Sequence, residues 1–128
     1  MTTNEHEKAS KPRVQAQIRI PQTLKKFIQL EAVQHDSSQQ KLVDEALQKM
    51  NRKCERHKKN DAKAPVFLST SVRKDGVLIY NMKIDGDIAE KMEKFAAFHG
   101  VTKRAYIYTA LSEFFLKRGY KPEASKEE

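Results

Sequence analysis

The sequence contains one cysteine, four glycines and no apolar run long enough to span a bilayer. A single cysteine, Cys54, excludes an intramolecular disulfide and with it a secreted fold held together by disulfides. The few glycines form no Gly-rich phosphate loop, and the first twelve residues contain no apolar signal sequence. We therefore expect a cytoplasmic protein in a reducing compartment.

Acidic residues are fewer than basic residues in this sequence. The chain carries 25 Lys and Arg against 17 Asp and Glu, a net charge of +8 and a pI near 9.6. This excess favours a polyanionic partner, with nucleic acid ahead of an anionic membrane surface. A net charge that merely keeps a small protein soluble is the alternative. The expected helices carry charges of mixed sign, which argues against a helix lying on a membrane.

The most informative feature is an internal repeat, in which residues 14–53 align without a gap on residues 78–117 at an offset of 64. Six positions are identical: Ile20/Ile84, Ala32/Ala96, His35/His99, Ala46/Ala110, Leu47/Leu111 and Lys53/Lys117. Because identity is low, the repeat rests on the shared pattern of apolar residues.

Each copy opens with a stretch in which apolar and polar residues alternate. The apolar positions are Val14, Ala16, Ile18 and Ile20 in the first copy, and Leu78, Tyr80, Met82 and Ile84 in the second. Alternation of this kind predicts a strand with one buried and one exposed face.

The pattern then changes to helical spacing, with stripes at Leu24, Ile28, Ala32 and at Ile88, Met92, Ala96. A turn is expected at 35–38 and at 99–102, with Gly100 supplying a permissive backbone in the second copy. A second helix follows, capped by Ser37 or Ser38 and by Thr102, and Gly119 ends the second copy.

Each copy is thus strand–helix–helix, and a unit of about forty residues buries too little surface to fold alone. Two copies together pair their strands antiparallel and close one core. We predict a mainly α fold with a short two-stranded ribbon, the repeats pairing within one chain as a pseudo-dimer. The expected organisation is a flexible arm (1–12), repeat one (13–53), a basic linker (54–76), repeat two (77–119) and a polar tail (120–128).

Two segments resemble the Arc/MetJ ribbon-helix-helix superfamily of DNA-binding proteins. QAQIRIP at 15–21 is similar to that family's strand of alternating polar residues ending in Pro, and GVTKRAYIYTAL at 100–111 to its turn and second helix. The resemblance covers about 80 of 128 residues. Because two copies lie in one chain, the architecture resembles that of TraY-like relaxosome accessory factors of conjugative plasmids. It implies sequence-specific binding of double-stranded DNA through the ribbon in the major groove, as a transcriptional repressor or a plasmid transfer or partition accessory protein.

The resemblance also implies site residues. The outward strand residues Gln15, Gln17 and Asn81 suit adenine, and Arg19 and Lys83 suit guanine. The start of the second helix holds phosphate in this family, which implies phosphate contacts for Ser38, Gln39, Thr102, Lys103 and Arg104. The alternatives are an ordinary solvated strand face and simple helix capping.

Three departures from the family pattern predict unequal half-sites and an imperfectly palindromic target. Ile79 stands where a polar reader is expected, and Asp85-Gly86 replaces the Pro, which brings an acid close to the DNA face. Glu31 takes the place that Phe95 has in the second copy, so the helices of the first copy should pack differently.

Two further segments are candidates for a role. VFLSTSV at 66–72, with Asp75-Gly76 as a turn, predicts a hairpin that lengthens the second strand. In the arm, Lys8, Lys11 and Arg13 are candidates for contacts with the DNA backbone, with plain disorder as the alternative.

Other functions find less support. The four histidines are scattered, and Cys54 and His57 have no second pair to complete a zinc site, so we expect neither an enzyme nor a cofactor. RNA is disfavoured because its narrow A-form major groove excludes a ribbon. The remaining alternative is a protein-interaction adaptor of a plasmid or phage complex, or an antitoxin, with secondary DNA binding; the short polar tail argues mildly against an antitoxin. The expected partners are duplex DNA, further copies of the protein on DNA and a relaxosome or partition protein, with no membrane.

Overall fold

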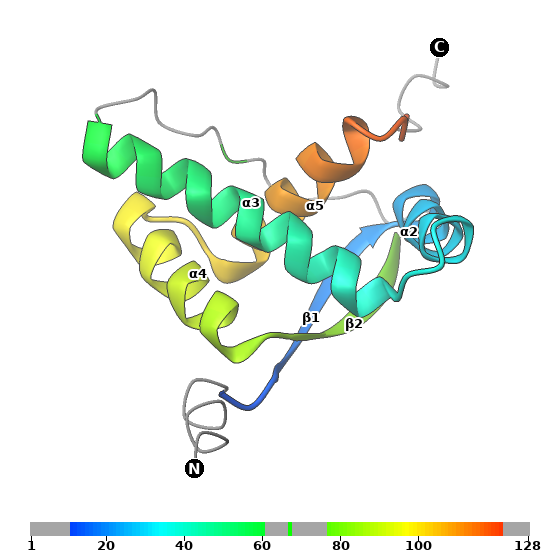
Figure 1. Ribbon diagram of the computed structural model, residues 1–128, viewed down its shortest axis with the longest axis horizontal. Coiled ribbons are helices and arrows are strands. Elements are labelled where there is room, and N and C mark those ends of the chain that lie inside the picture. Colours follow the sequence, from blue (N-terminus) through cyan, green and yellow to red (C-terminus); the bar gives the residue numbers. More distant parts are fainter. Residues whose placement is uncertain (1–10, 61–66, 68–76, 122–128) are drawn as a thin grey trace.

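The computed structural model describes residues 11–60, 67 and 77–121. These residues form two successive strand–helix–helix units (Figure 1): β1 (Val14–Pro21), α2 (Gln22–Gln34), α3 (Gln39–Asn60), then β2 (Val77–Ile84), α4 (Gly86–His99), α5 (Lys103–Leu116). The predicted repeat and the mainly α fold class are confirmed. None of the described helices has the length and apolar character needed to cross a membrane.

The two strands pair antiparallel with each other into a two-stranded ribbon. Gln17 lies opposite Asn81 at its centre, and these two residues are also equivalent in the repeat, since 17 + 64 = 81. An approximate two-fold axis therefore passes between them and relates the two halves of the chain. The pairing of the repeats within one chain is confirmed.

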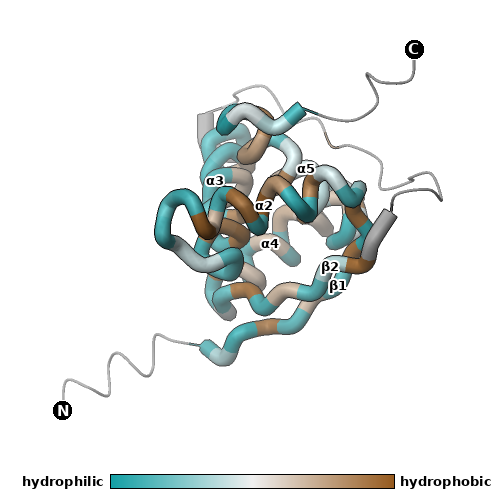
Figure 2. The backbone as a smooth tube through the Cα atoms, turned by 90° about the vertical axis from the view of Figure 1, so that its right-hand side faces the viewer, coloured by the Kyte–Doolittle hydropathy of each residue, from teal (hydrophilic) through white to brown (hydrophobic). Residues whose placement is uncertain are grey.

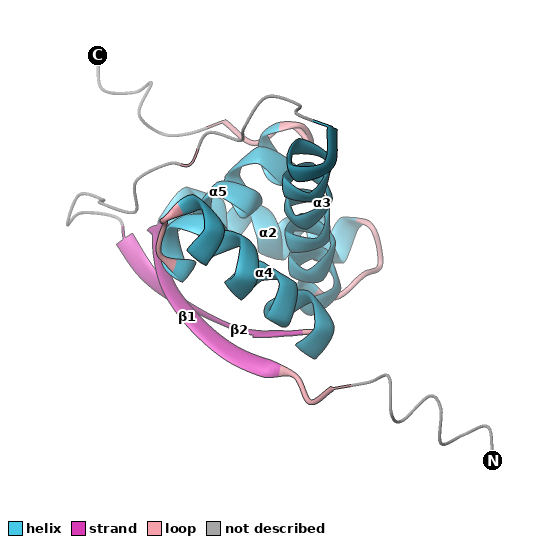
Figure 3. Ribbon diagram, turned by 90° about the vertical axis from the view of Figure 1, so that its left-hand side faces the viewer, coloured by secondary structure: helices cyan, strands magenta, loops and turns pink. Residues whose placement is uncertain are grey.

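The helices cover only one face of the ribbon, which runs along the edge of the helical layer in Figures 2 and 3. The inner strand face supplies Ile18, Ile20, Tyr80, Met82 and Ile84 to a single core, which also takes up the apolar stripes of all four helices. Because both repeats contribute to this one core, neither has an apolar interior of its own.

Three of the four described helices are capped at their N-termini by a side chain. The Ser38 hydroxyl accepts a hydrogen bond from the Lys41 N–H at 3.0 Å, and the Thr102 hydroxyl accepts one from the Ala105 N–H at 3.0 Å. At α4 the Asp85 carboxylate accepts from the N–H groups of Asp87 and Ile88. The acid at the position equivalent to Pro21 of the first repeat therefore serves as a helix cap.

The turns between the helices end in left-handed backbone. Gly100 has φ 68° and is the C-cap of α4. Its equivalent in the first repeat is Asp36, since 36 + 64 = 100, and Asp36 has φ 53° without being a glycine. The same turn is thus built in both repeats, with a residue in the first that tolerates this conformation less well.

The two repeats differ in the length of their second helix. The last residue of α5, Leu116, is equivalent to Arg52, whereas α3 continues to Asn60, eight residues further (60 − 52 = 8). The start of the linker therefore extends α3. The predicted strand at 66–72 and its turn at 75–76 lie outside the described residues, apart from Phe67.

Glu31 stands where the second repeat has Phe95 and makes ionic contacts there. It is buried, at 7% exposure, and its carboxylate pairs with the Arg118 guanidinium at 3.1 Å and with His35 at 3.6 Å. The apolar position of one repeat has thus become an ion pair to the segment after α5 in the other.

Candidate nucleic-acid interface

The outer face of the ribbon carries all five residues predicted to read bases. Their side chains are exposed, because they alternate with the buried inner set. They are Gln15, Gln17 and Arg19 on β1, and Asn81 and Lys83 on β2. Another outward position on β2 is Ile79, 48% exposed. The structure therefore brings the five residues together in one row on the face that the helices leave uncovered.

The centre of this row is a hydrogen-bonded amide pair. The Gln17 amide nitrogen donates to the Asn81 side-chain oxygen at 2.8 Å, across the two-fold axis. This bond holds both side chains in place and leaves the Gln17 oxygen as an acceptor and the Asn81 amide nitrogen as a donor. An acceptor beside a donor is the pattern that pairs with the major-groove edge of adenine.

Positive charge flanks this pair on both sides. Arg19 lies opposite Ile79 and Lys83 opposite Gln15, so the two cations sit at diagonal corners of the ribbon. They are also equivalent in the repeat, since 19 + 64 = 83. The ribbon is thus symmetric in its cations and its amides, and asymmetric where Gln15 corresponds to Ile79.

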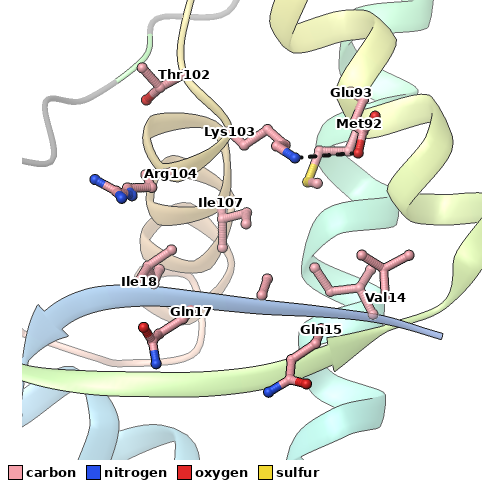
Figure 4. Close-up of a pocket in the computed structure, with 12 residues that line it drawn as sticks. Val14, Gln15, Gln17, Ile18, Met92, Glu93, Thr102, Lys103, Arg104 and Ile107 are labelled. Atoms are coloured by element: carbon pink, nitrogen blue, oxygen red, sulfur yellow. Dashed lines mark hydrogen bonds and ion pairs between the residues drawn. The ribbon is translucent and has the colours of Figure 1, made fainter.

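The second helix of each unit begins beside the strand of the other unit. A hollow of about 420 Å³ separates β1 from the start of α5 and is lined by Gln15, Gln17, Thr102, Lys103 and Arg104, among others (Figure 4). In Figure 4 the side chains of Gln15 and Gln17 leave β1 on the side away from α5, and Ile107 of α5 lies nearer the strand than Thr102 does. Two predicted base readers and the predicted phosphate ligands of α5 therefore border the same hollow, with the glutamine side chains directed to its far side.

The corresponding place beside β2 is filled. Tyr80 is equivalent to Ala16, since 16 + 64 = 80, and its hydroxyl donates to the Gln39 side-chain oxygen at 2.9 Å. Burial raises the pKa of Tyr80 to about 12, so the phenol stays a neutral donor. Ala16 is too small to do the same, which leaves the hollow beside β1 open.

The predicted phosphate residues are therefore not equally available. The Lys103 ammonium pairs with Glu93 at 3.4 Å, and Gln39 is engaged by Tyr80. Within the described segments, no carboxylate lies within ion-pair distance of Arg104. Arg104 is thus the principal uncompensated cation at the start of α5, where the helix dipole adds to its charge.

Residues before β1 stabilise the ribbon in a way that the sequence pattern did not indicate. Arg13 pairs with Asp44 at 2.7 Å and donates to the backbone oxygen of Lys83 at 2.9 Å. Lys11 forms an ion pair with Glu90. Both are sequence candidates for contacts with the DNA backbone, and both are engaged by carboxylates on the helices; Lys8 lies outside the described residues.

No three His, Cys, Asp or Glu side chains among the described residues are grouped as a metal site would require. Cys54 is buried, 3.6 Å from the Tyr106 hydroxyl, and burial raises the pKa of its thiol. The rings of His57 and His99 pack together with their centroids 5.8 Å apart. Burial of the His99 ring lowers its pKa, and the nearby His57 lowers it further.

Comparison with known proteins adds no assignment: no family model, no curated protein and no solved structure matches this chain. The class of the fold is nevertheless defined by the structure, as two strand–helix–helix units that share an antiparallel ribbon.

Proposed function

We propose that this protein binds double-stranded DNA sequence-specifically, as a tandem ribbon-helix-helix protein of TraY-like architecture. The observation that carries the proposal is the row of polar side chains on the uncovered ribbon face, centred on the Gln17–Asn81 pair. A major groove about 12 Å wide admits a two-stranded ribbon, and its base edges present the acceptors and donors that this row complements.

Phosphates complete the interface. A ribbon inserted in the groove has one DNA backbone on each side, where the starts of α3 and α5 lie beside the strands. Ser38 and Gln39 would meet one backbone, and Thr102, Lys103 and Arg104 the other, fixing the register of the ribbon on the bases. Because Arg104 has no counterpart in α3, the backbone beside α5 is expected to be held more tightly.

The biological role proposed is that of a cytoplasmic, non-enzymatic repressor or accessory protein of plasmid transfer or partition. The scaffold serves all of these roles, and the chemistry of the ribbon does not select among them. Copies assembled side by side on DNA, or a relaxosome or partition protein, would be the further partners.

The test is selection of bound duplexes from a random pool, followed by gel shift with the selected duplex. We expect an imperfect inverted repeat to be enriched, and its complex to resist competition by random duplex and by RNA of the same length. Equal competition by RNA would overturn the proposal, because an A-form groove excludes the ribbon.

A further inference from the structure

A second basic surface lies between α3 and α5, away from the ribbon. It is a groove of about 370 Å³ whose base contains Ala46 and Met50 of α3 and Ala110 and Phe114 of α5. We call it the α3–α5 groove. Ala46 is equivalent to Ala110 and Met50 to Phe114, since both pairs differ by 64. The groove therefore straddles the same approximate two-fold axis as the ribbon.

The approximate two-fold axis passes through the molecule and meets its surface on two opposite sides. The Gln17–Asn81 pair marks one side, on the outer face of the ribbon, and the α3–α5 groove marks the other. Figure 3 agrees, since α3 and α5 extend there to the side of the helical layer away from the strands. The two surfaces thus face in opposite directions, and a straight duplex seated on the ribbon does not reach the groove.

Basic side chains dominate the lining of the groove. Six cations and one carboxylate, Glu113, line it, a formal charge of +5 (6 − 1), whereas the outer ribbon face carries only Arg19 and Lys83. The six cations are Lys49, Arg52, Lys53 and Arg56 of α3, and Lys117 and Arg118 at the end of α5. A cluster of six of the chain's 25 Lys and Arg therefore lies on the face opposite the ribbon.

Some of this charge is compensated internally. Lys53 pairs with Glu113 across the groove at 2.7 Å, and Arg118 pairs with Glu31 at 3.1 Å. For the other four lining cations, no carboxylate of the described residues lies within ion-pair distance. They are Lys49, Arg52, Arg56 and Lys117.

The cations on α3 share one face of the helix. Lys49, Arg52 and Arg56 recur at i, i+3 and i+7. Glu45 and Glu55 are acidic neighbours on the same helix, but in the described residues neither lies within ion-pair distance of these three cations. Lys117 lies at the end of α5, where a cation favours the helix dipole. The exposed arginines of α3 are therefore available to an anionic ligand outside the chain.

We propose that the α3–α5 groove binds the phosphate backbone of a second DNA duplex, so that one molecule bridges two DNA segments. Guanidinium groups suit phosphate, and a protein held on DNA by its ribbon meets further duplex at high local concentration. This choice of ligand rests on the proposed function. An acidic protein segment is the competing occupant.

The experiment measures capture of a second duplex. Beads carrying the cognate duplex are loaded with protein, and retention of a labelled non-cognate duplex is followed as salt is raised. We compare Arg52→Glu/Arg56→Glu with Lys91→Glu/Lys94→Glu, a matched control of equal charge change on exposed lysines of α4. Binding of the cognate duplex alone, measured by anisotropy, reports on the ribbon and on folding.

We expect the groove variant to keep its cognate affinity and capture the second duplex much more weakly, while the control keeps both. The salt dependence of capture should be less steep by about 0.9 in log–log slope for each phosphate that the variant no longer neutralises. Sedimentation should show one protein chain joining two duplexes.

Three results would overturn the bridging proposal while cognate binding persists. They are equal capture by the groove variant, two protein chains in each bridged complex, and tighter binding of poly-glutamate than of a duplex of the same charge to the groove of the cognate-loaded protein. If the wild-type protein does not bind the cognate duplex, the proposed function itself is contradicted.

Discussion

Gln17 and Asn81 show how single residues set the character of the ribbon. Each is a polar residue at an outward strand position, and only the antiparallel register makes them partners at 2.8 Å. Arg19 and Lys83 then take symmetric places beside them, while Gln15 and Ile79 break the symmetry. The specificity of the ribbon should accordingly be graded from strand to strand, with β1 contributing more polar readers than β2.

Arg19→Ala should weaken binding to the selected duplex by about 1–3 kcal/mol and relax the preference at one base position, because a guanidinium reads guanine through two hydrogen bonds. Arg104→Ala is the matched control. It should weaken binding to all sequences alike and lower the salt slope by about 1, since it removes a phosphate contact. Anisotropy with cognate and scrambled duplexes measures both effects. Unchanged discrimination in Arg19→Ala would show that β1 is not the reader.

Glu31 and Arg118 provide a second test at the residue scale. Arg118→Met leaves the buried Glu31 carboxylate with only His35, so we expect the free energy of unfolding to fall by about 1–3 kcal/mol, less than for a fully buried pair because Arg118 is partly exposed. Urea unfolding measures the change. Adding Glu31→Leu should restore much of the loss, because no unpaired charge then remains. A double variant as unstable as the single one would contradict this account.

At the scale of elements, the two repeats solve the same problems with different residues. Ser38 and Thr102 cap equivalent helices, and Asp36 and Gly100 form equivalent left-handed turns. Differences appear where an element meets the other repeat. Helix α3 is eight residues longer than the equivalence with α5 requires (60 − 52 = 8). Of the equivalent residues Ala16 and Tyr80, Tyr80 has the hydroxyl that bonds to the helix beside its strand. Local sequence thus explains the caps and turns, and contacts between the repeats explain their inequality.

The turns make a paired prediction. Asp36→Gly should stabilise the protein by about 0.5 kcal/mol, because glycine adopts φ 53° without steric cost, although it loses more backbone entropy on folding. Gly100→Ala should destabilise it by about 1 kcal/mol, since alanine is strained at φ 68°. Thermal and urea unfolding of both variants give the two signs. A destabilised Asp36→Gly would indicate that the aspartate side chain supports the turn.

At the scale of the whole molecule, one covalent chain supplies both halves of the pseudo-dimer. The single core takes residues from β1 to the segment after α5, and the ribbon joins strands from both halves. The two ends of the two-fold axis then carry different surfaces, an amide-centred ribbon and a cationic groove. A dimer of identical chains must carry the same residues in both halves. In this chain each half has its own sequence, so equivalent positions can carry different residues.

Covalent pairing predicts that stability does not depend on protein concentration. Light scattering in dilute solution should give a monomer near 14.8 kDa, and the melting temperature should stay constant as the protein is diluted. The measurement is made without DNA, so that assembly on a duplex does not contribute. A melting temperature that falls on dilution would indicate that strands pair between chains.

The sequence by itself determined the elements, their order and the row of outward polar residues, because alternation, helical stripes, caps and turns are local properties of the chain. The offset of 64 also predicted which strands pair. Tertiary structure alone decided which side chains meet: Gln39 with Tyr80, Glu31 with Arg118, and Arg13 with Asp44. It also decided that six Lys and Arg side chains line the α3–α5 groove. Periodicity shows which face of an element is buried, but strand register and helix crossing determine what that face meets, and these depend on the packing of the whole core.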